Sequence, residues 1–588
     1  MLMQQTPLKS QAWLQTIAKQ FAELSHYEST AFVFILKAWR ILSSNQVITD
    51  KTLTYDDFFS HELKNTKLHN IFSTLAKEHK VFSLFIEQFP HFDKLDMEIL
   101  NRVFILVESE SLGNVNDAFF HYDSRRVPSV SHQVAALGVQ LLDSNESTIY
   151  MPFTPDFTVA YHTDKTIHAE GEGRGNQLIA ELIKVIDDKE IIYNVTDPLR
   201  APSYQDDQAT HLLKKFKAVI SFPPFNQKGK LDLSNDKYNR FKLHRGTNLN
   251  IAHFEHILAQ TKEKAVVLMP VGFTYRSGAD EAFRRDLVEK NWLEAIVQLP
   301  TNVHTGTSIE TTFFIINKLK VDNNVQFISL KGDTFTQRDG RRTVFKDIDT
   351  IFNIYKERTD VDNIAALVSN EEVVANDYSL AVDRYVLSKE AAMLQKQLEK
   401  YELIELQEIA DIRRSQLFKD ELDGFAVTEV GPSDLSHSGE TKPEGKVKHL
   451  DKQLNKLKTY ALQQDDIVLS TKGTIGKVGL ISCLPNSVIA SQAMQVIRLK
   501  EGSSYDPITL YMYIKSDLGQ AMLKQLVSGV AMPQISTVDI KKFKVPLLSK
   551  EEIVKVHDDY FAEHEHYAKI AKSQEDIKKI HSNFLGEN

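Results

Sequence analysis

Between residues 131 and 317, apolar runs typical of strands alternate with amphipathic runs typical of helices, and this alternation most constrains the fold. The strands are predicted at 147–151, 166–169, 190–194, 218–221, 265–269, 293–298 and 310–317. The helices between them are predicted at 131–142, 176–186, 251–260 and 284–290. Such alternation favours a mostly parallel sheet with helices on both faces.

One of these strands ends abruptly in the sequence Ser-Phe-Pro-Pro-Phe-Asn. Val219 and Ile220 are the end of a buried strand, and Pro223 and Pro224 cannot continue a ladder because they lack N–H donors. The chain therefore leaves the sheet at the carboxyl end of a strand, where open α/β sheets bind their ligands. Phe225 then lies on a stiff turn and suits stacking against a base taken out of a duplex. Taken alone, the motif also fits a proline turn packed under two aromatic rings.

The length of 588 residues exceeds what one core supports and predicts three or four domains. The 42% hydrophobic and 25% charged residues are ordinary for a globular protein, and no apolar run approaches the roughly 20 residues of a membrane helix. Residues 1–20 contain no signal-peptide core, and the lone Cys483 excludes an internal disulfide framework or a cysteine-rich zinc site. We expect a cytoplasmic protein.

The net charge of −9 neither suggests nor excludes binding of nucleic acid.

Several ordered motifs in the middle of the chain resemble the modification subunit of type I restriction-modification systems, which belongs to the adenine-specific (N-6) DNA methyltransferases. They are the motif at 222–225, the run Ala265–Pro270, the run Trp292–Pro300, the run Thr305–Ile309 and the segments Asn376–Leu380 and Arg384–Tyr385. The resemblance implies a seven-stranded methyltransferase-type α/β sheet. It also implies S-adenosylmethionine as cofactor and DNA adenine as substrate.

The resemblance places the catalytic motif on Phe222, Pro223, Pro224 and Phe225, and Phe222 stands where the family has asparagine. In the family this asparagine and a proline carbonyl accept hydrogen bonds from the target amino group and orient its lone pair. A phenylalanine side chain accepts none. Ser221 and Asn226 lie at the wrong positions to replace it, so this departure predicts loss of methyl transfer.

The resemblance places the cofactor on Pro128, Tyr150, Pro152, Phe153 and Glu170. In the family a glycine-rich turn follows the first strand, and its glycines let the backbone approach the cofactor closely. The N-terminus of the next helix then faces the cofactor. Here the matching stretch, 150–157, keeps Pro152 but no glycine, and phenylalanine is not expected to adopt positive φ. We expect Phe153 and Phe157 to fill the cofactor's space.

An acidic residue at the end of the second strand binds the ribose hydroxyls in the family, and Glu170 is the nearest candidate. It precedes Gly171-Glu-Gly-Arg-Gly175, which fits either a relocated nucleotide-binding turn or a flexible loop.

The last third of the chain resembles half of a type I specificity subunit, with one target-recognition domain. The matching segments are 406–414, 464–477, 490–492, 529–536 and 544–547. Candidate DNA-binding residues are those able to neutralise phosphates, approach them closely or read base edges. They are Arg413, Arg414, Lys452, Lys456, Lys458, Lys472, Gly473, Lys477, Gln492 and Gln534. For the lysines, a solvated surface is the alternative interpretation.

We expect five domains: a helical domain at 1–118, a methyltransferase-like domain at 119–355, a helical linker at 356–400, a target-recognition domain at 401–548 and a terminal helix at 549–588. Because one recognition domain is half of a specificity subunit, we expect a homodimer through residues 551–585 that reads a palindromic site. The helix could instead pack on the N-terminal bundle.

Three functions fit these observations. The first is a sequence-specific DNA-binding fusion with a silent catalytic site, which marks DNA for a nuclease or helicase partner in phage defence. The second is an active S-adenosylmethionine-dependent adenine methyltransferase, and the third is a structural assembly subunit. The sequence shows neither a nuclease carboxylate–lysine cluster nor a phosphate-binding loop of a motor.

Overall fold

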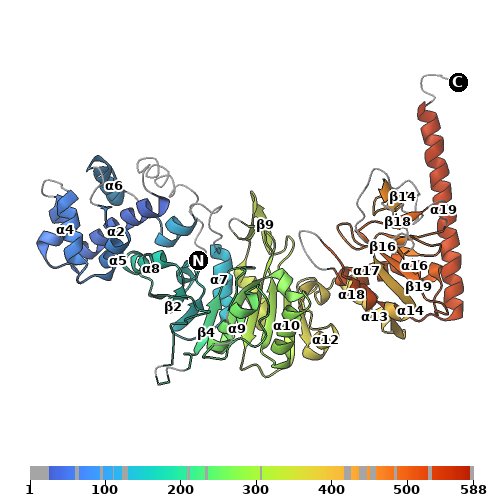
Figure 1. Cartoon of the computed structure of the whole chain (residues 1–588), viewed down its shortest axis with the longest axis horizontal. Coiled ribbons are helices and arrows are strands. Elements are labelled where there is room, and N and C mark those ends of the chain that lie inside the picture. The colour runs from blue at the N-terminus through green and yellow to red at the C-terminus, as the bar shows by residue number, and fades with distance from the viewer. Residues whose placement is uncertain are drawn as a thin grey trace. The chain divides into compact units, whose positions relative to one another are not determined.

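The structure is a computed structural model that describes most of the chain. The described residues are 25–59, 65–92, 97–109, 112–121, 130–206, 208–209, 212–231, 236–304, 307–415, 425–435, 446–450, 459–482, 487–527 and 533–582. The chain divides into two compact units, Met1–Val382 and Asp383–Asn588 (Figure 1). Within the described residues, no helix is both long and apolar enough to cross a membrane.

The first unit begins with helices, as predicted. They are α2 (His26–Ser44), η2 (Lys51–Leu53), α3 (Tyr55–Phe59), α4 (Asn65–Leu75), α5 (Lys80–Gln88), α6 (Met97–Ser109) and the π-turn η4 (Asp117–His121). Their core forms around Trp39, whose ring meets Tyr55, Phe58 and Phe72 edge to face at 5.3–5.5 Å. The predicted helix around Trp13 to Leu24 lies outside the described residues.

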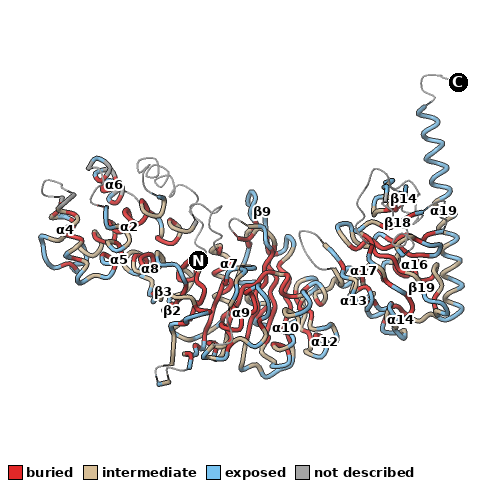
Figure 2. Tube along the Cα trace, in the orientation of Figure 1, coloured by how far each residue is buried: buried red, intermediate tan, exposed pale blue. Residues whose placement is uncertain are grey.

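A nine-stranded sheet forms the centre of the first unit, with strand order β11-β8-β6-β7-β5-β4-β1-β2-β3. The strands are β1 (Thr148–Pro152), β2 (Thr166–Gly171), β3 (Ile191–Val195), β4 (Phe216–Ser221), β5 (Thr261–Pro270), β6 (Leu293–Gln298), β7 (Thr311–Asn317), β8 (Asn324–Ser329) and β11 (Ala365–Ser369). Strand β7 is antiparallel to both of its neighbours, and β11 is antiparallel to β8. Figure 2 shows these strands buried along most of their length.

The seven strands from β3 to β6 in this order form the predicted methyltransferase-type sheet, and β8 and β11 extend it by two strands. Strand β11 lies inside the region expected to be a helical linker, so that expectation is corrected. Its sequence, Ala-Ala-Leu-Val-Ser, is a short apolar run, and periodicity alone cannot assign such a run to a helix or to a strand. Pairing with the edge of β8 makes it a strand.

Helices cover both faces of the sheet. On one face lie α7 (His132–Leu142), α8 (Arg174–Asp187) and α11 (Ile348–Glu357), and on the other lie α9 (Asn250–Gln260) and α10 (Ala279–Glu289). Phe313 and Phe314 in β7 point to opposite faces because side chains alternate along a strand. Phe313 lies 3.3 Å from the position a Cβ would take at Gly138 of α7, whereas the Phe314 ring meets Phe254 of α9 at 5.6 Å.

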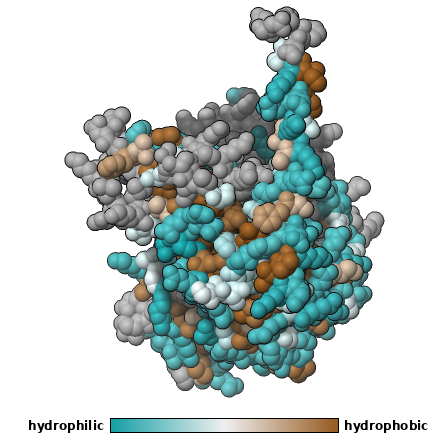
Figure 3. All heavy atoms as spheres, turned by 90° about the vertical axis from the view of Figure 1, so that its right-hand side faces the viewer, coloured by the Kyte–Doolittle hydropathy of each residue, from teal (hydrophilic) through white to brown (hydrophobic). Residues whose placement is uncertain are grey.

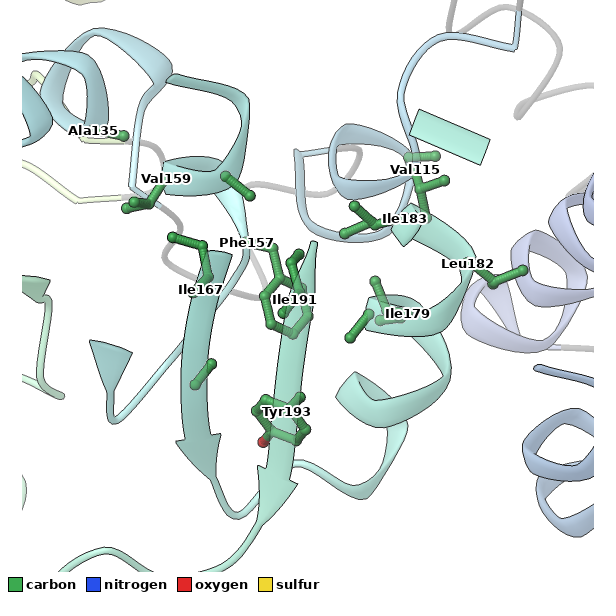
Figure 4. Packing of buried hydrophobic residues seen from close by; sticks show 14 of the residues in the cluster. Val115, Ala135, Phe157, Val159, Ile167, Ile179, Leu182, Ile183, Ile191 and Tyr193 are labelled. Carbon is green, nitrogen blue, oxygen red and sulfur yellow. The ribbon is translucent and has the colours of Figure 1, made fainter. Parts of the chain in front are cut away.

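The helical N-terminal region packs against α8. The Tyr27 hydroxyl of α2 donates to Gln88 Oε1 at 2.8 Å and to the carbonyl of Gly175 at 3.1 Å. Lys80 of α5 pairs with Glu181 at 2.6 Å. On its inner side, α8 packs Ile179 and Ile183 over β2 and β3 (Figure 4).

A separate two-stranded hairpin, β9 (Thr336–Asp339) and β10 (Arg342–Phe345), stands between β8 and α11. The remaining elements of the first unit are η5 (Thr158–His162), η6 (Val271–Thr274), α12 (Asn370–Ala375) and the start of η7 (Val382–Arg384).

The second unit is the predicted α+β domain. A four-stranded sheet has the order β13-β19-β16-β17, from β13 (Ala410–Arg414), β16 (Ile467–Ser470), β17 (Val478–Leu480) and β19 (Met494–Leu499). A three-stranded sheet joins β14 (Phe425–Val430), β15 (Lys446–Leu450) and β18 (Val488–Ala490), and β12 (Leu403–Glu405) pairs with β20 (Lys544–Pro546). The helices are α13 (Lys389–Leu398), α14 (Leu406–Ile409), α16 (Pro507–Lys515), α17 (Asp517–Gln525), α18 (Thr537–Lys541) and α19 (Lys550–Ser582).

Candidate functional site

The proline motif lies at the carboxyl end of β4, as predicted. Pro223 is buried, Pro224 is exposed and Phe225 is half-buried, with its ring 6.3 Å from that of His304. Phe222 is 5% exposed and belongs to the hydrophobic core, where its ring meets Phe313 at 6.3 Å. At the position of the family's hydrogen-bond acceptor, the structure therefore has an apolar core residue.

The two polar neighbours of the motif have partners within the protein. The hydroxyl of Ser221 is buried and donates to the carbonyl of Pro152 in the adjacent strand at 2.9 Å. The backbone amide of Asn226 donates to Asn250 Oδ1 at 3.0 Å, and the side-chain Nδ2 of Asn250 donates to Asn226 Oδ1 at 3.3 Å. Both side chains thus contribute to holding the motif in place.

The turn after β1 differs from the sequence expectation at one residue. Phe153 has φ 59°, so a phenylalanine does occupy the left-handed region that the family gives to glycine. Two hydrogen bonds from Thr154 hold the turn. Its Oγ1 donates to the Met151 carbonyl at 2.6 Å, and its backbone amide donates to the Glu170 carbonyl of the neighbouring strand at 3.3 Å. The Phe153 ring also packs edge-on against His253, with ring centroids 4.6 Å apart. Such contacts compensate for backbone strain.

No full helix follows β1 directly. The chain instead forms the five-residue 3-10 turn η5, whose N-terminus is preceded by Phe157. Phe157 is fully buried and meets Tyr193 edge to face at 5.6 Å, and Figure 4 shows it beside Ile167 and Ile191. Both phenylalanines of this turn are therefore buried. Pro128 lies outside the described residues.

Glu170, at the end of β2, is fully buried and held by hydrogen bonds from several neighbours. The Tyr150 hydroxyl donates to Oε1, and Oε2 accepts from the Ser203 amide at 2.9 Å and from the Ser203 hydroxyl at 2.5 Å. Burial disfavours the charged form, but hydrogen bonds from His256, Ser203 and Tyr150 outweigh it and lower the pKa of Glu170. Glu170 is therefore a buried carboxylate whose oxygens already accept hydrogen bonds.

The protonation of His256 follows from its other neighbour. Arg240 Nη1 lies 2.7 Å from His256 Nδ1, and a guanidinium only donates, so Nδ1 accepts. Because burial lowers the pKa of His256, the ring is neutral and carries its proton on Nε2, which faces the Tyr150 hydroxyl at 3.0 Å and Glu170 Oε1 at 3.6 Å. Arg240 in turn pairs with Asp236 at 2.9 Å. We call Tyr150, Glu170, Ser203, Arg240 and His256 the Glu170 network.

The glycine-rich segment after Glu170 forms a short strand-to-helix turn, so it is not a long loop, and nucleotide binding by this turn stays a prediction. It comprises the end of β2 and the start of α8, and a Cβ at Gly175 would lie 2.5 Å from the Tyr27 hydroxyl. A Cβ at Gly171 would lie 3.1 Å from the Tyr193 hydroxyl. Close packing therefore accounts for these two glycines.

In the second unit, three predicted DNA-binding loops converge at one end of the four-stranded sheet. The Lys472 amide donates to the Ala493 carbonyl at 3.2 Å, one residue from Gln492. The Gly473 amide donates to the Pro533 carbonyl at 3.0 Å, and Lys472 pairs with Gln534 in a β-bridge. Gly473 has φ 71°, and Gln492 and Gln534 are exposed.

The same end of this sheet carries the other predicted residues that the structure describes. Arg414, the last residue of β13, pairs with Gln495 of β19, and Arg413 is 39% exposed. Lys477 is exposed just before β17, and its amide donates to Ser470 Oγ at 2.9 Å. The structure thus brings together Arg413, Arg414, Lys472, Gly473, Lys477, Gln492 and Gln534, and we call this set the recognition edge.

Not every basic residue of this region is available for phosphate. Lys448, which the sequence includes in the lysine cluster, pairs with Glu429 at 2.8 Å and is mostly buried. Lys452, Lys456 and Lys458 lie outside the described residues.

Sequence reasoning missed two structural pairs next to these sites. Arg498 donates through Nε and Nη2 to the buried Asp466, both at 2.6 Å, and lines a hollow with Arg413 and Arg414. Arg240 and Asp236, four residues apart, anchor the Glu170 network. The spacing of Asp236 and Arg240 was a visible signal, whereas Asp466 and Arg498 meet only through strand pairing.

Within the described residues, no group of histidine, cysteine and acidic side chains is arranged to hold a metal ion.

Comparison with known families supports both halves of this description. A family model for N-6 DNA methylases matches residues 179–393, and one for the type I restriction modification DNA specificity domain matches residues 398–574.

Curated relatives match part of the chain. The type I restriction enzyme MpnII methylase subunit of Mycoplasma pneumoniae is 27% identical over 184 residues, which are 30% of this chain and 34% of the relative. The type I restriction enzyme MjaVII methylase subunit of Methanocaldococcus jannaschii is 27% identical over 269 residues, which are 41% of this chain and 45% of the relative. The chain therefore spans less than half the length of each.

Among solved structures, the type I restriction-modification methyltransferase subunit from Streptococcus thermophilus superposes with a TM-score of 0.52 at 17% identity. It covers 64% of this chain and 99% of its own length, and it supports the fold. Together with the two family matches, the strand order and the separate α+β unit, these similarities show that the chain carries an N-6 DNA methylase domain followed by a type I restriction modification DNA specificity domain.

Proposed function

We propose that this protein is a sequence-specific reader of double-stranded DNA in a restriction-modification system, and that its methylase domain no longer transfers methyl groups. The observation that carries the proposal is Phe222, a core residue at the position where the family needs a hydrogen-bond acceptor. A base amino group placed there would meet an apolar ring, which neither orients its lone pair nor stabilises positive charge.

The residues around β1 and β2 do not fit S-adenosylmethionine in the manner of the family. The oxygens of Glu170 accept hydrogen bonds from Tyr150 and Ser203, so binding of ribose hydroxyls would require their displacement. Phe153 and Phe157 put two aromatic side chains into the turn that the family builds from glycine. The five-residue turn η5 also provides no long helix whose N-terminus could face the cofactor.

The recognition edge supports DNA reading. It combines two exposed cations, Arg414 and Lys477, and two half-buried ones, Arg413 and Lys472, with backbone at Gly473 that can approach a phosphate and with glutamines that can read base edges. These residues sit on three loops that the backbone bonds of Lys472 and Gly473 hold together. A rigid, mixed surface of this kind suits specific binding more than general attraction to polyanions.

An active adenine methyltransferase is the second candidate. It is favoured by the intact seven-strand order and by Phe225, which lies half-buried at the carboxyl edge after two prolines. In that case another group would have to accept the hydrogen bonds of the target amine.

Calorimetric titration of S-adenosylmethionine into the full chain, with and without duplex DNA, separates the two candidates. We expect no binding heat at millimolar cofactor. One-to-one binding together with methyl transfer to adenine would overturn the proposal.

Selection of bound duplexes from a random pool, followed by anisotropy titration, tests the reading function. We expect a selected sequence, and we expect K472Q/K477Q to weaken binding to it and to lower the salt slope by about one to two units. The control K550Q/K555Q removes the same charge from exposed positions at the start of α19. Absence of any selected sequence would favour the structural assembly subunit instead.

We further propose that two copies associate through α19 and read a palindromic site, to which a nuclease or helicase subunit is recruited. The first half of α19 packs on its own domain, with Glu563 paired to Lys515 at 2.6 Å and the Tyr560 ring 6.1 Å from Tyr511. From Ala568 to Ser582 every residue is exposed, including Ile570, Ile577 and Ile580 at 51–70%. Figure 3 shows hydrophobic residues along this projecting helix. A lone exposed helix of this length is marginal in water, so a second helix is its natural partner.

A further inference from the structure

The hairpin β9–β10 of the methylase domain carries three arginines at its tip. Arg338, Arg341 and Arg342 are exposed, and Asp339 and Arg342 pair across a two-residue turn. Gly340 has φ 59° with open space around it, so the turn geometry rather than packing calls for glycine. The hairpin projects beyond the main sheet in Figure 1, and its tip is exposed in Figure 2.

The base of the hairpin is firmly attached. Gln133 of α7 exchanges two hydrogen bonds with the backbone of Phe345, at 2.8 and 3.0 Å. The Thr343 amide donates to the Asn302 carbonyl at 3.0 Å, and Phe335 and Phe345 are buried below. The arginines are therefore presented on a rigid ribbon and lose little backbone entropy on binding.

These arginines differ from others on the surface of the same unit. Arg200 pairs with Asp197, Arg285 with Glu281 and Arg358 with Asp322. Within the part of the chain that the structure describes, the side chains of Arg338, Arg341 and Arg342 make no ion pair or hydrogen bond. Three guanidinium groups and one carboxylate, Asp339, lie within residues 338–342, so the tip has a net charge of +2 and a local positive field, although the chain as a whole is acidic.

The hairpin also stands beside the proline motif. It anchors on Asn302, in the loop that leaves β6 at the carboxyl edge of the sheet, and His304 of the same loop meets the ring of Phe225. A two-stranded ribbon with arginines at its tip fits the phosphate backbone that borders a DNA groove.

We propose that the β9–β10 hairpin is a second DNA contact, which binds phosphates of the duplex outside the segment read by the recognition edge. This inference rests on the proposed DNA-reading function. The hairpin adds affinity without sequence information, because phosphate contacts position a protein but do not read bases.

The test compares R341Q/R342Q with K215Q/K262Q in the full-length protein. Lys215 and Lys262 are exposed at the amino ends of β4 and β5, on the opposite edge of the sheet. Each variant replaces two cations, so both lose the same charge. All four substitutions are at exposed positions, and thermal melting verifies folding. Binding to the selected duplex is measured by anisotropy from 50 to 300 mM salt, and hydroxyl-radical footprints are recorded.

We expect R341Q/R342Q to lower the salt slope by about two units for each bound copy of the chain and affinity by at least about tenfold. We also expect it to remove protection at the two flanks of the footprint, one flank for each copy of the proposed dimer, while the selected sequence stays the same. The control variant should bind like the wild type. Equal slopes and footprints for the wild type and R341Q/R342Q would refute the hairpin contact alone, whereas a wild type that binds no DNA would refute the reading function and this inference with it.

Discussion

Phe222, at the position that the N-6 methylase resemblance assigns to the catalytic acceptor, is a core residue. Its ring is 5% exposed and packs on Phe313, so the residue now contributes to folding. Restoring the family's asparagine would bury an amide in this apolar surrounding, and an unsatisfied buried amide costs roughly 1–3 kcal/mol.

We therefore expect F222N to be less stable than F222L by about 1–3 kcal/mol, and still unable to methylate DNA. Urea unfolding and transfer of labelled methyl groups measure the two effects. F222L is the matched control, because it reduces packing without adding a polar group. Methyl transfer by F222N would show that the cofactor site is intact and that this residue alone is missing.

Glu170 leads to a prediction about pH. Its pKa in the folded state is lowered below the ordinary value of 4.5, so the unfolded state binds more protons as the pH falls. The stabilisation from this carboxylate is fully present above about pH 4.5 and is lost as the pH falls through the folded pKa.

E170Q should be less stable at pH 7 and should lose less stability than the wild type on acidification below pH 4.5. Thermal melts between pH 3 and pH 7 measure the difference. The control E357Q removes the same charge from Glu357, the exposed last residue of α11. Parallel pH profiles for wild type and E170Q would contradict the buried, ionised carboxylate.

Some features of the candidate site at the ends of β1, β2 and β4 were predictable from residue identity, and others were not. The loss of the acceptor at Phe222 was readable, because an apolar side chain has no lone pair wherever it points. The left-handed conformation of Phe153 was not, because the hydrogen bonds of Thr154 and the packing on His253 that stabilise it come from distant segments. The partners of Glu170 on α9 and in the 197–204 loop were likewise invisible before the fold was known.

At the scale of elements, Gly175 determines how α2 packs against α8. A Cβ there would lie 2.5 Å from the Tyr27 hydroxyl and 2.9 Å from its ring carbon Cζ. We expect G175A to weaken this interface by about 1–3 kcal/mol and to speed hydrogen exchange in α2 and α5. In the control G173A, the new Cβ meets the flexible amide of Asn176, so a smaller effect is expected. Equal protection in G175A and wild type would show that the helices shift without cost.

Buried central strands were predictable from the sequence, whereas one short strand at the edge of the sheet was not. The strand predicted at 293–298 matches β6 residue for residue, because a six-residue buried run between clear breaks has one interpretation. Strand β11 was mistaken for part of a helical linker. The hairpin β9–β10 did have a signal, since Gly340-Arg341 between short strand-like runs fits a two-residue hairpin turn with glycine at its first position.

At the scale of the whole molecule, the prediction concerns association. We expect the wild type to be a dimer in sedimentation equilibrium, and I570E/I577E to be a monomer that binds a palindromic site at least tenfold more weakly. The control K572Q/K578Q changes the net charge by the same amount on the same helix. A monomeric wild type, or a dimeric I570E/I577E, would contradict association through α19.

The sequence predicted five domains rather than two compact units, although the change from alternating strands and helices to short strands and turns was visible in the last third of the chain. The boundaries proposed from sequence stay predictions. The homodimer expected through residues 551–585 stays a prediction, and the exposed isoleucines of α19 that support it are recognisable only once its first half is seen to pack on α16.

The Glu170 network also bears on cell physiology. An enzyme whose folded state is completed by a metabolite follows the supply of that metabolite, whereas here Tyr150, Ser203 and His256 supply the contacts from within the chain. Under the proposed reading function, this protein would occupy its sites equally in starved and in well-fed cells, so its action on DNA would be constitutive with respect to one-carbon metabolism.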